Sequence, residues 1–168
     1  MGLISPADQQ QLRDAFSGMK RPVRLLFFTQ TLGCETCVQT RQILDELPVL
    51  SDKIAIEEVN FILEKDKASQ YGVDRVPAIA ITYDETEHGA NAGEALAAED
   101  VRGPNGAPGA TRDSRIRFLG APAGYEFVSL VQAVLLVGGR EPALSAENRA
   151  RLAAVDTPLT LRVFTTPT

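Results

Sequence analysis

The sequence contains few of the residues on which several classes of protein depend. It has two cysteines and one histidine in 168 residues. Cys34 and Cys37 lie in one short motif, whereas a secreted scaffold held by disulfides needs several cysteine pairs spread along its chain. A tetrahedral zinc site usually takes four cysteine or histidine ligands, and this chain adds only His88. A disulfide scaffold and a zinc site within one chain are therefore both excluded.

The chain also lacks long basic and long apolar runs. Its 17 basic and 22 acidic residues give a formal net charge of −5, and no basic run is longer than Lys20-Arg21. Nucleic acids and anionic membranes usually bind basic faces, so we expect neither as a partner. No apolar run approaches the roughly 18 residues of a transmembrane helix. The first residues lack the pattern of a signal peptide, so we expect a cytoplasmic protein.

The apolar residues follow the pattern of an α/β protein. They make up 44% of the chain, which is enough for a sizeable core. Ser5, followed by a proline, predicts the cap of a helix that ends near Gly18. Helical spacing predicts further helices over 37–47, 64–71, 127–135 and 145–154. Short runs of strand-forming residues predict strands over 23–29, 54–59, 78–83 and 115–119.

The third and fourth predicted strands are separated by a long polar segment. Residues 84–115 are rich in glycine, alanine, asparagine and acidic residues and contain few large apolar side chains. Such a segment buries too little surface to offset the entropy of ordering. We expect a flexible surface insertion, with the two strands paired as an antiparallel hairpin. His88 falls in the insertion, and we assign it no catalytic role.

The two cysteines lie between a predicted strand and a predicted helix, which is typical of a redox site. The free N–H groups and the dipole at the start of a helix favour the Cys34 thiolate. Cys37, one helical turn further on and more deeply buried, can attack a mixed disulfide on Cys34 and release the substrate. We therefore assign Cys34 as the nucleophile and Cys37 as the resolving thiol.

The two residues between the cysteines, Glu35 and Thr36, are expected to tune this couple. The Glu35 carboxylate suits the start of a helix but repels a neighbouring thiolate. We therefore expect Cys34 to be less acidic than proline or histidine at position 35 would make it. This indicates a fairly reducing couple.

Pro77, directly after Val76, is the second candidate element of the site. It stands at the start of a predicted strand. A cis Val76–Pro77 bond would turn the Val76 backbone toward the disulfide, where it could pair with an extended substrate segment. A trans proline on an edge strand is the alternative.

Two pairs of charged residues fall on predicted strands. Glu57 and Glu58 lie next to each other, so one of them could point inward and accept a proton from Cys37. A pair that faces solvent is the alternative. Arg115 and Arg117 alternate along the fourth strand, and we expect both to face water.

The end of the chain resembles its beginning, which indicates an internal repeat; a chance similarity of two short strands is the alternative. Proline, phenylalanine and threonine recur at a constant offset in 22–29 and 158–165, each time after a capped helix. We therefore predict one unit over 1–139 and, over 140–168, a linker with the first helix and strand of a second unit. We expect either a shortened form of a longer protein or a chain that ends within a repeat. The strand of a partial unit would fray or pair with another chain.

The order strand, CxxC, helix, strand, helix, proline, strand, strand, helix resembles the thioredoxin fold. Three stretches, 1–5, 119–127 and 163–168, are similar to the glutaredoxin-like protein disulfide oxidoreductases of thermophilic prokaryotes. Proteins of that family have two thioredoxin-like units, each with a CxxC motif and a cis-proline. The resemblance covers residues 1–83 and 116–168. It implies an α/β fold with a mixed central sheet flanked by helices, an extra N-terminal helix and a partial second repeat.

The resemblance also implies a function. Cys34 and Cys37 match the redox pair of the first unit, and Pro77 matches its cis-proline. The implied activity is thiol–disulfide exchange on protein disulfides, with a role in cell redox homeostasis and no organic cofactor in this chain. Thioredoxin reductase and peroxiredoxins are the implied partners. The insertion over 84–115 and the absence of a second CxxC motif depart from the family pattern.

Two other functions stay open at this point. The chain could be a non-catalytic interaction unit that supports a second redox unit. Alternatively, two chains could share a metal ion or a cluster through their CxxC motifs.

Overall fold

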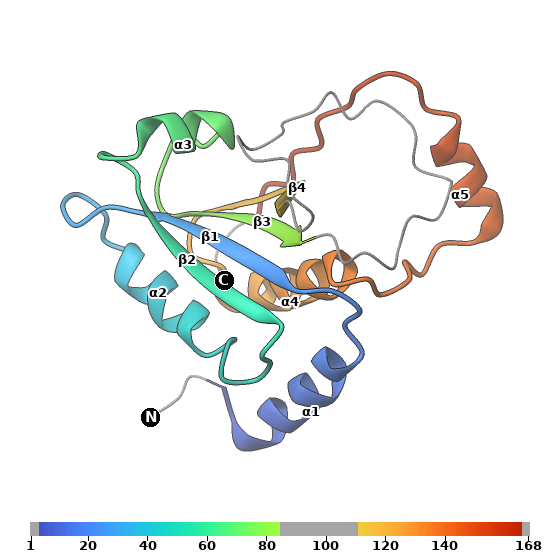
Figure 1. The fold of residues 1–168 in the computed structure, drawn as a ribbon, viewed down its shortest axis with the longest axis horizontal. Helices are drawn as coiled ribbons and strands as arrows, with labels where there is room; N and C mark the ends of the chain where they lie inside the picture. The colour runs from blue at the N-terminus through green and yellow to red at the C-terminus, as the bar shows by residue number, and fades with distance from the viewer. Residues whose placement is uncertain (1–3, 85–110, 166–168) are drawn as a thin grey trace.

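The computed structural model describes residues 4–84 and 111–165, and its centre is a four-stranded sheet of order β2-β1-β3-β4 (Figure 1). The strands are β1 (Val23–Thr29), β2 (Ile54–Asn60), β3 (Ala78–Asp84) and β4 (Thr111–Leu119). β1 pairs in parallel with β2 and antiparallel with β3, and β3 pairs antiparallel with β4. The mixed sheet and the pairing of the third and fourth strands confirm the prediction.

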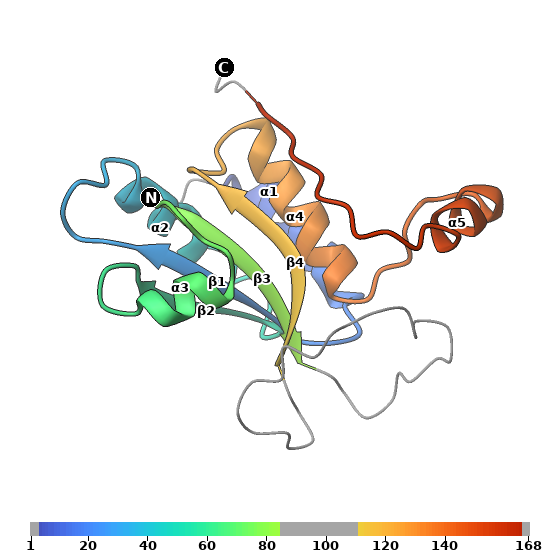
Figure 2. The same ribbon diagram turned by 90° about the horizontal axis from the view of Figure 1, so that it is seen from above.

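Helices cover both faces of this sheet. They are α1 (Pro6–Ser17), α2 (Cys37–Asp45), α3 (Lys65–Gln70), α4 (Tyr125–Val137) and α5 (Ala146–Ala153). Figure 1 shows α1, α2 and α4 on one face and α3 on the other, and in Figure 2 α5 lies away from the sheet. The predicted α/β class with an extra N-terminal helix is therefore confirmed. In the described part of the chain, no helix has both the length and the apolar character needed to cross a membrane.

The N-terminal helix begins where its cap predicts. The Ser5 hydroxyl accepts a hydrogen bond from the Asp8 N–H at 3.2 Å, and the Asp8 carboxylate accepts one from the Ser5 hydroxyl at 2.6 Å. A capping side chain satisfies an N–H group that has no partner within the helix. The helix then buries Phe16 completely in the core.

β1 lies at the centre of the sheet because its side chains are buried on both faces. Leu25 and Phe27 join a core cluster with α1, α2 and α4, and Leu26 and Phe28 join a second cluster with α3. All four side chains are at most 2% exposed. Successive strand residues point to opposite faces, so one apolar run supplies both cores. This confirms the prediction of a strand buried on both faces.

The predicted insertion is shorter than residues 84–115. β3 runs to Asp84 and β4 starts at Thr111, which lies opposite Asp84 and donates a hydrogen bond to its carboxylate at 2.7 Å. The start of β4 is polar, so the apolar run that predicts the strand does not include it. A strand is held by backbone hydrogen bonds, which polar residues form as well. Residues 85–110, with His88, lie outside the described residues.

The predicted strand near the C-terminus does not form. α5 begins as expected, with the Ser145 hydroxyl accepting from the Asn148 N–H at 3.2 Å, but residues 158–165 are in no strand. Leu161 and Phe164 are each 89% exposed. A strand needs a neighbour for its N–H and C=O groups, and within the described residues this segment has none. The assignment of 140–168 to a second unit stays a prediction.

The repeated phenylalanines, Phe28 and Phe164, should therefore differ in their contribution to stability. Phe28→Ala opens a cavity in the core and should cost about 3–5 kcal/mol of unfolding free energy. Phe164→Ala should change it by no more than about 0.5 kcal/mol, because the side chain is exposed. Urea unfolding of the two variants beside the wild type measures both values. Comparable losses would show that the C-terminal segment is part of the folded core.

Candidate active site

The two cysteines form a disulfide at the start of α2. Cys34 and Cys37 are bonded, with their Cα atoms 5.4 Å apart. Cys37 is the first residue of the helix and is 5% exposed, whereas Cys34 lies in the turn before the helix and is only partly buried. The two cysteine residues are thus unequally exposed to solvent. The more exposed of the two is the residue assigned as the nucleophile.

The chain around the disulfide turns sharply between β1 and α2. Gly33, directly before Cys34, has φ of +72°, which glycine adopts without strain. Thr36 is the N-cap of α2, and its carbonyl accepts hydrogen bonds from the N–H and the hydroxyl of Thr40, both at 2.9 Å. Glu35 is exposed. Both residues between the cysteines are therefore at the surface, next to the disulfide.

The Val76–Pro77 peptide bond is cis and lies at the same end of the sheet as the disulfide. β1 ends at Thr29 and leads to the cysteines, and Phe28 in that strand is paired with Ala78, the first residue of β3. Pro77 directly precedes Ala78. The register of two central strands therefore brings together segments that are about 40 residues apart.

The two neighbouring glutamates lie on opposite faces of β2. Glu57 is opposite Leu26 on the α3 face and pairs with Arg24 and Lys67. Glu58 lies on the face that carries α2 and pairs with Arg41 of that helix. Each carboxylate has a cationic partner, so neither matches the inward-pointing proton acceptor considered for Cys37.

Arg117 does not face water as expected. Its side chain is 19% exposed and its guanidinium forms a two-point contact with the Asp113 carboxylate, at 2.8 and 2.5 Å. A register shift in β4 explains the contact: Arg117 is opposite Ala80 and Asp113 is opposite Thr82, so they are neighbours on one face. Arg115, in the shifted part, has φ of +62° and is exposed. The shift depends on strand pairing, which the spacing of these residues in the sequence does not show.

A groove between α2 and α4 was not predicted. It has a volume of about 450 Å³ and runs between α2 and the start of α4. The residues that line it are Ile4, Gln39, Gln42, Ile43, Glu46, Pro122, Ala123, Gly124 and Phe127. Gln39 follows Cys37 by two residues in α2, and neither cysteine lines the groove. No single motif marks it in the sequence, because three separate segments form it.

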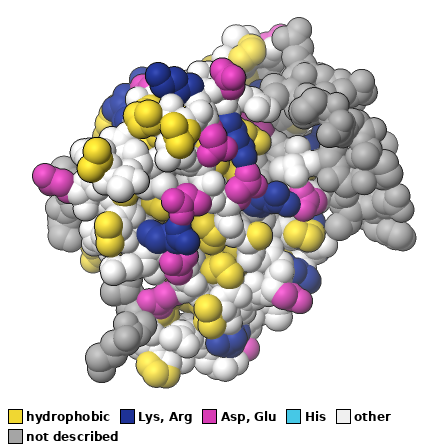
Figure 3. Space-filling view, turned by 60° about the vertical axis from the view of Figure 1, so that its left-hand side comes forward, with side chains coloured by type: hydrophobic (Ala, Val, Ile, Leu, Met, Phe, Trp, Pro, Cys, Tyr) yellow, Lys and Arg dark blue, Asp and Glu magenta, His cyan; other side chains and the backbone are white. Residues whose placement is uncertain are grey.

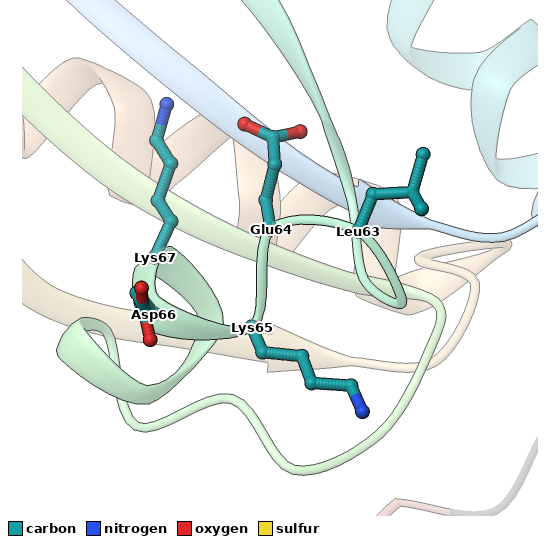
Figure 4. A pocket seen from close by; sticks show the side chains of 5 residues that line it. All are labelled: Leu63, Glu64, Lys65, Asp66 and Lys67. Atoms are coloured by element: carbon teal, nitrogen blue, oxygen red, sulfur yellow. The ribbon is translucent and has the colours of Figure 1, made fainter.

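A second hollow, lined by residues 63–67, does not form a site. Figure 4 shows the Lys65 side chain pointing away from those of Glu64 and Lys67. Glu64 accepts a hydrogen bond from the Asn60 N–H at 2.7 Å, and Lys67 pairs with Glu57. These charged groups therefore serve local structure rather than converging on a ligand.

The surface near the disulfide is mixed in character. Figure 3 shows the side of the molecule that is at the left of Figure 1, with hydrophobic side chains between acidic and basic ones. Leu32, before the cysteines, and Val38, after them, are 83% and 67% exposed. A partner that reaches the disulfide would therefore meet apolar side chains on both sides of it.

Comparisons with known proteins support this architecture. No protein-family model and no curated protein matches the sequence. A domain of the alkylhydroperoxide reductase AhpF from Enterococcus faecalis is 25% identical, with a TM-score of 0.67 over 89% of this chain and 59% of its own. A protein disulfide oxidoreductase from Aeropyrum pernix is 23% identical, with a TM-score of 0.61 over 88% of this chain and 53% of its own.

The fold is thioredoxin-like. This confirms the fold that the motif order implied. The chain spans less than two thirds of the length of the two solved structures that it resembles. The thioredoxin-like fold with its bonded Cys34–Cys37 pair supports thiol–disulfide exchange in general.

The charge of Glu35 should set the reduction potential of the disulfide. Glu35→His removes a negative charge next to Cys34, which stabilises the thiolate and hence the reduced form. We expect the potential to rise by on the order of 10–30 mV. Equilibration with glutathione buffers followed by thiol trapping measures it. Glu147→His, the same change on the exposed helix α5, is the control and should leave the potential unchanged. An equal potential in Glu35→His and the wild type would refute this role of Glu35.

The ion pairs of Glu57 should make stability depend on pH. Burial opposes ionisation of this carboxyl, but hydrogen bonds from Lys67 and Arg24 outweigh it and hold the pKa of Glu57 below its ordinary value. The stabilisation is therefore present at neutral pH and is lost as the pH falls through the lowered pKa. Because the pair is partly exposed, Glu57→Gln should cost less than about 1 kcal/mol at neutral pH. Urea unfolding from about pH 7 to about pH 3 should show this cost shrinking. A loss of unfolding free energy in Glu57→Gln that is the same at the highest and the lowest pH would contradict the role of the Glu57 ion pairs.

Proposed function

We propose that this chain exchanges thiols and disulfides with protein substrates through Cys34 and Cys37. The observation that carries the proposal is the position of the disulfide, whose more exposed residue is Cys34, at the same end of the sheet as the Val76–Pro77 segment. The proposal needs no organic cofactor in this chain, since the two sulfur atoms carry both electrons.

The order of the reaction steps follows from the unequal exposure of the two cysteine residues. In the reduced protein the Cys34 thiolate attacks one sulfur of a substrate disulfide, and the other substrate sulfur leaves as a thiolate. Cys37 then loses its proton and attacks the Cys34 sulfur, which closes the Cys34–Cys37 disulfide and releases the second substrate thiol. The substrate gains two electrons and the protein loses two. The reverse sequence oxidises a substrate dithiol.

Val76 and Pro77 are proposed as substrate-binding residues. Val76 and Pro77 lie at the end of the sheet where β1 leads into the turn that carries the cysteines. Within the described residues the Val76 backbone makes no backbone hydrogen bond, so an extended peptide can pair with it. The groove between α2 and α4 offers an apolar surface for a side chain of the same substrate.

The partners and the compartment are part of the proposal. Turnover as a reductase requires a source of electrons, and the resemblance to protein disulfide oxidoreductases points to a thioredoxin reductase. The likeness to a domain of an alkylhydroperoxide reductase supports peroxiredoxin-type acceptors. We propose that the chain acts in the cytoplasm, where these partners would maintain redox homeostasis.

Cysteine variants test the proposed roles. In Cys37→Ser the mixed disulfide on Cys34 cannot be resolved, so incubation with a disulfide-containing protein such as insulin should leave a covalent complex that a thiol reductant releases. Cys34→Ser should form no such complex, because Cys37 is 5% exposed. Non-reducing gel electrophoresis and mass spectrometry detect the complex.

Two results would contradict these roles. Complexes formed equally by both variants would refute the assignment of nucleophile and resolving thiol. No complex with either variant, together with no reduction of insulin by the wild type, would favour a non-catalytic interaction unit.

A further inference from the structure

Arg117 makes its contacts on the face of the sheet that does not carry the disulfide. The guanidinium Nε donates a hydrogen bond to the Tyr71 carbonyl at 2.8 Å, while both terminal nitrogens bind Asp113. The guanidinium also lies 5.4 Å from the centre of the Tyr71 ring. One side chain of β4 thus holds the backbone and the ring of one residue in another element.

Tyr71 is the point from which the chain runs to the cis bond. It caps the C-terminus of α3, and Gly72 follows with φ of +63°. Its ring contacts Phe28, with the two ring centres 6.1 Å apart. Burial and the nearby Asp113 carboxylate raise the pKa of Tyr71, so the hydroxyl stays neutral in this setting. The start of segment 72–77 is therefore fixed to both β1 and β4.

The other end of segment 72–77 is fixed by the sheet. The Gly120 N–H donates to the Pro77 carbonyl at 2.8 Å, and Ala78 then joins the pairing with β1 and β4. Val73 is buried near the first end, and its N–H donates to the Ala68 carbonyl at 2.8 Å. Between these anchors, no backbone hydrogen bond within the described residues ties positions 74–76 to another element. Val76 packs against both core clusters, so its geometry depends on that packing and on the two fixed ends of the segment.

We propose that Arg117 is a positioning residue that fixes segment 72–77 and so sets the Val76 backbone for binding a protein substrate. This inference rests on the proposed function. It assigns to Arg117 no contact with the substrate or with the sulfur atoms. Arg117 lies opposite Ala80 on the α3 face, while Cys37 is in the core cluster on the other face. Its removal should therefore weaken protein binding and leave the redox couple intact.

Two variants of Arg117 separate its geometry from its charge. Arg117→Met keeps much of the length but removes every side-chain hydrogen bond, and it should raise the KM for insulin reduction by roughly five- to tenfold, the size of one ordinary net hydrogen bond. The rate with oxidised glutathione and the reduction potential should not change. Arg117→Lys keeps the charge without the planar fork and should fall between Arg117→Met and the wild type.

Arg13→Met is the matched control. Arg13 of α1 also donates to a backbone carbonyl, that of Val49 at 2.9 Å, in a part of the molecule that does not form the site. It should leave the KM for insulin at the wild-type value. Thermal unfolding of each variant shows whether it is folded at the assay temperature. If Arg117→Met is unfolded at that temperature, the KM for insulin, the glutathione rate and the potential are compared for Arg117→Lys instead.

The outcomes distinguish this inference from the proposed function. A higher KM for insulin in the Arg117 variants, with an unchanged potential and an unchanged glutathione rate, supports it. An unchanged KM, or equal losses with insulin and glutathione, overturns the positioning role while the proposed function stands. A wild-type protein that reduces neither substrate refutes the proposed function and this inference with it.

Discussion

The burial of β1 on both faces is the constraint from which most of the structure follows. A strand that carries Leu25 and Phe27 on one face and Leu26 and Phe28 on the other requires helices on both sides of the sheet. It also takes the central position, with β2 and β3 as neighbours. Large apolar side chains at these positions contribute several kcal/mol each when buried, so a different arrangement would expose them.

The same strand places the chemistry. Its last residues lead into the turn that carries Cys34 and Cys37, and its pairing with β3 brings the Val76–Pro77 bond to that end of the sheet. Neither segment creates the site alone. The disulfide supplies a sulfur to attack, and the chain before Pro77 supplies a backbone on which a peptide can be held.

The two faces of the sheet contribute differently to the site. The α2 face carries the disulfide, with Cys37 buried in an apolar core, and α2 also lines the groove. The α3 face holds polar contacts, among them the ion pairs of Glu57 and the contacts of Arg117 with Asp113 and Tyr71. These polar groups make their contacts away from the sulfur atoms and hold the neighbouring segments of the chain in place.

Features encoded in neighbouring residues could be predicted from the sequence. The Ser5 cap, the apolar run of β1 and the CxxC motif each lie within a few residues, and local physics determines what they form. The polar start of β4 at Thr111 and the contacts of Arg117 could not be predicted in this way. Both depend on which residues of β3 they face, and a register shift within β4 sets that pairing.

The C-terminal segment 158–165 also shows that a local sequence pattern is not enough to predict a strand. Residues 158–165 have the composition of β1 but form no strand, because a strand requires partners as well as propensity. β1 has such partners on both sides. Sequence similarity between the two segments therefore predicts what 158–165 could form beside suitable neighbours, and not its conformation in this chain.

The reduction potential of the Cys34–Cys37 couple tests the central claim most directly. The protein would be equilibrated with glutathione buffers, and its free thiols trapped and counted by mass spectrometry. The account predicts a reversible two-electron transition between roughly −270 and −120 mV, the range of known thiol–disulfide oxidoreductases. Thiols that stay reduced across this range, or a disulfide that resists reduction throughout it, would contradict the assignment of this site to exchange.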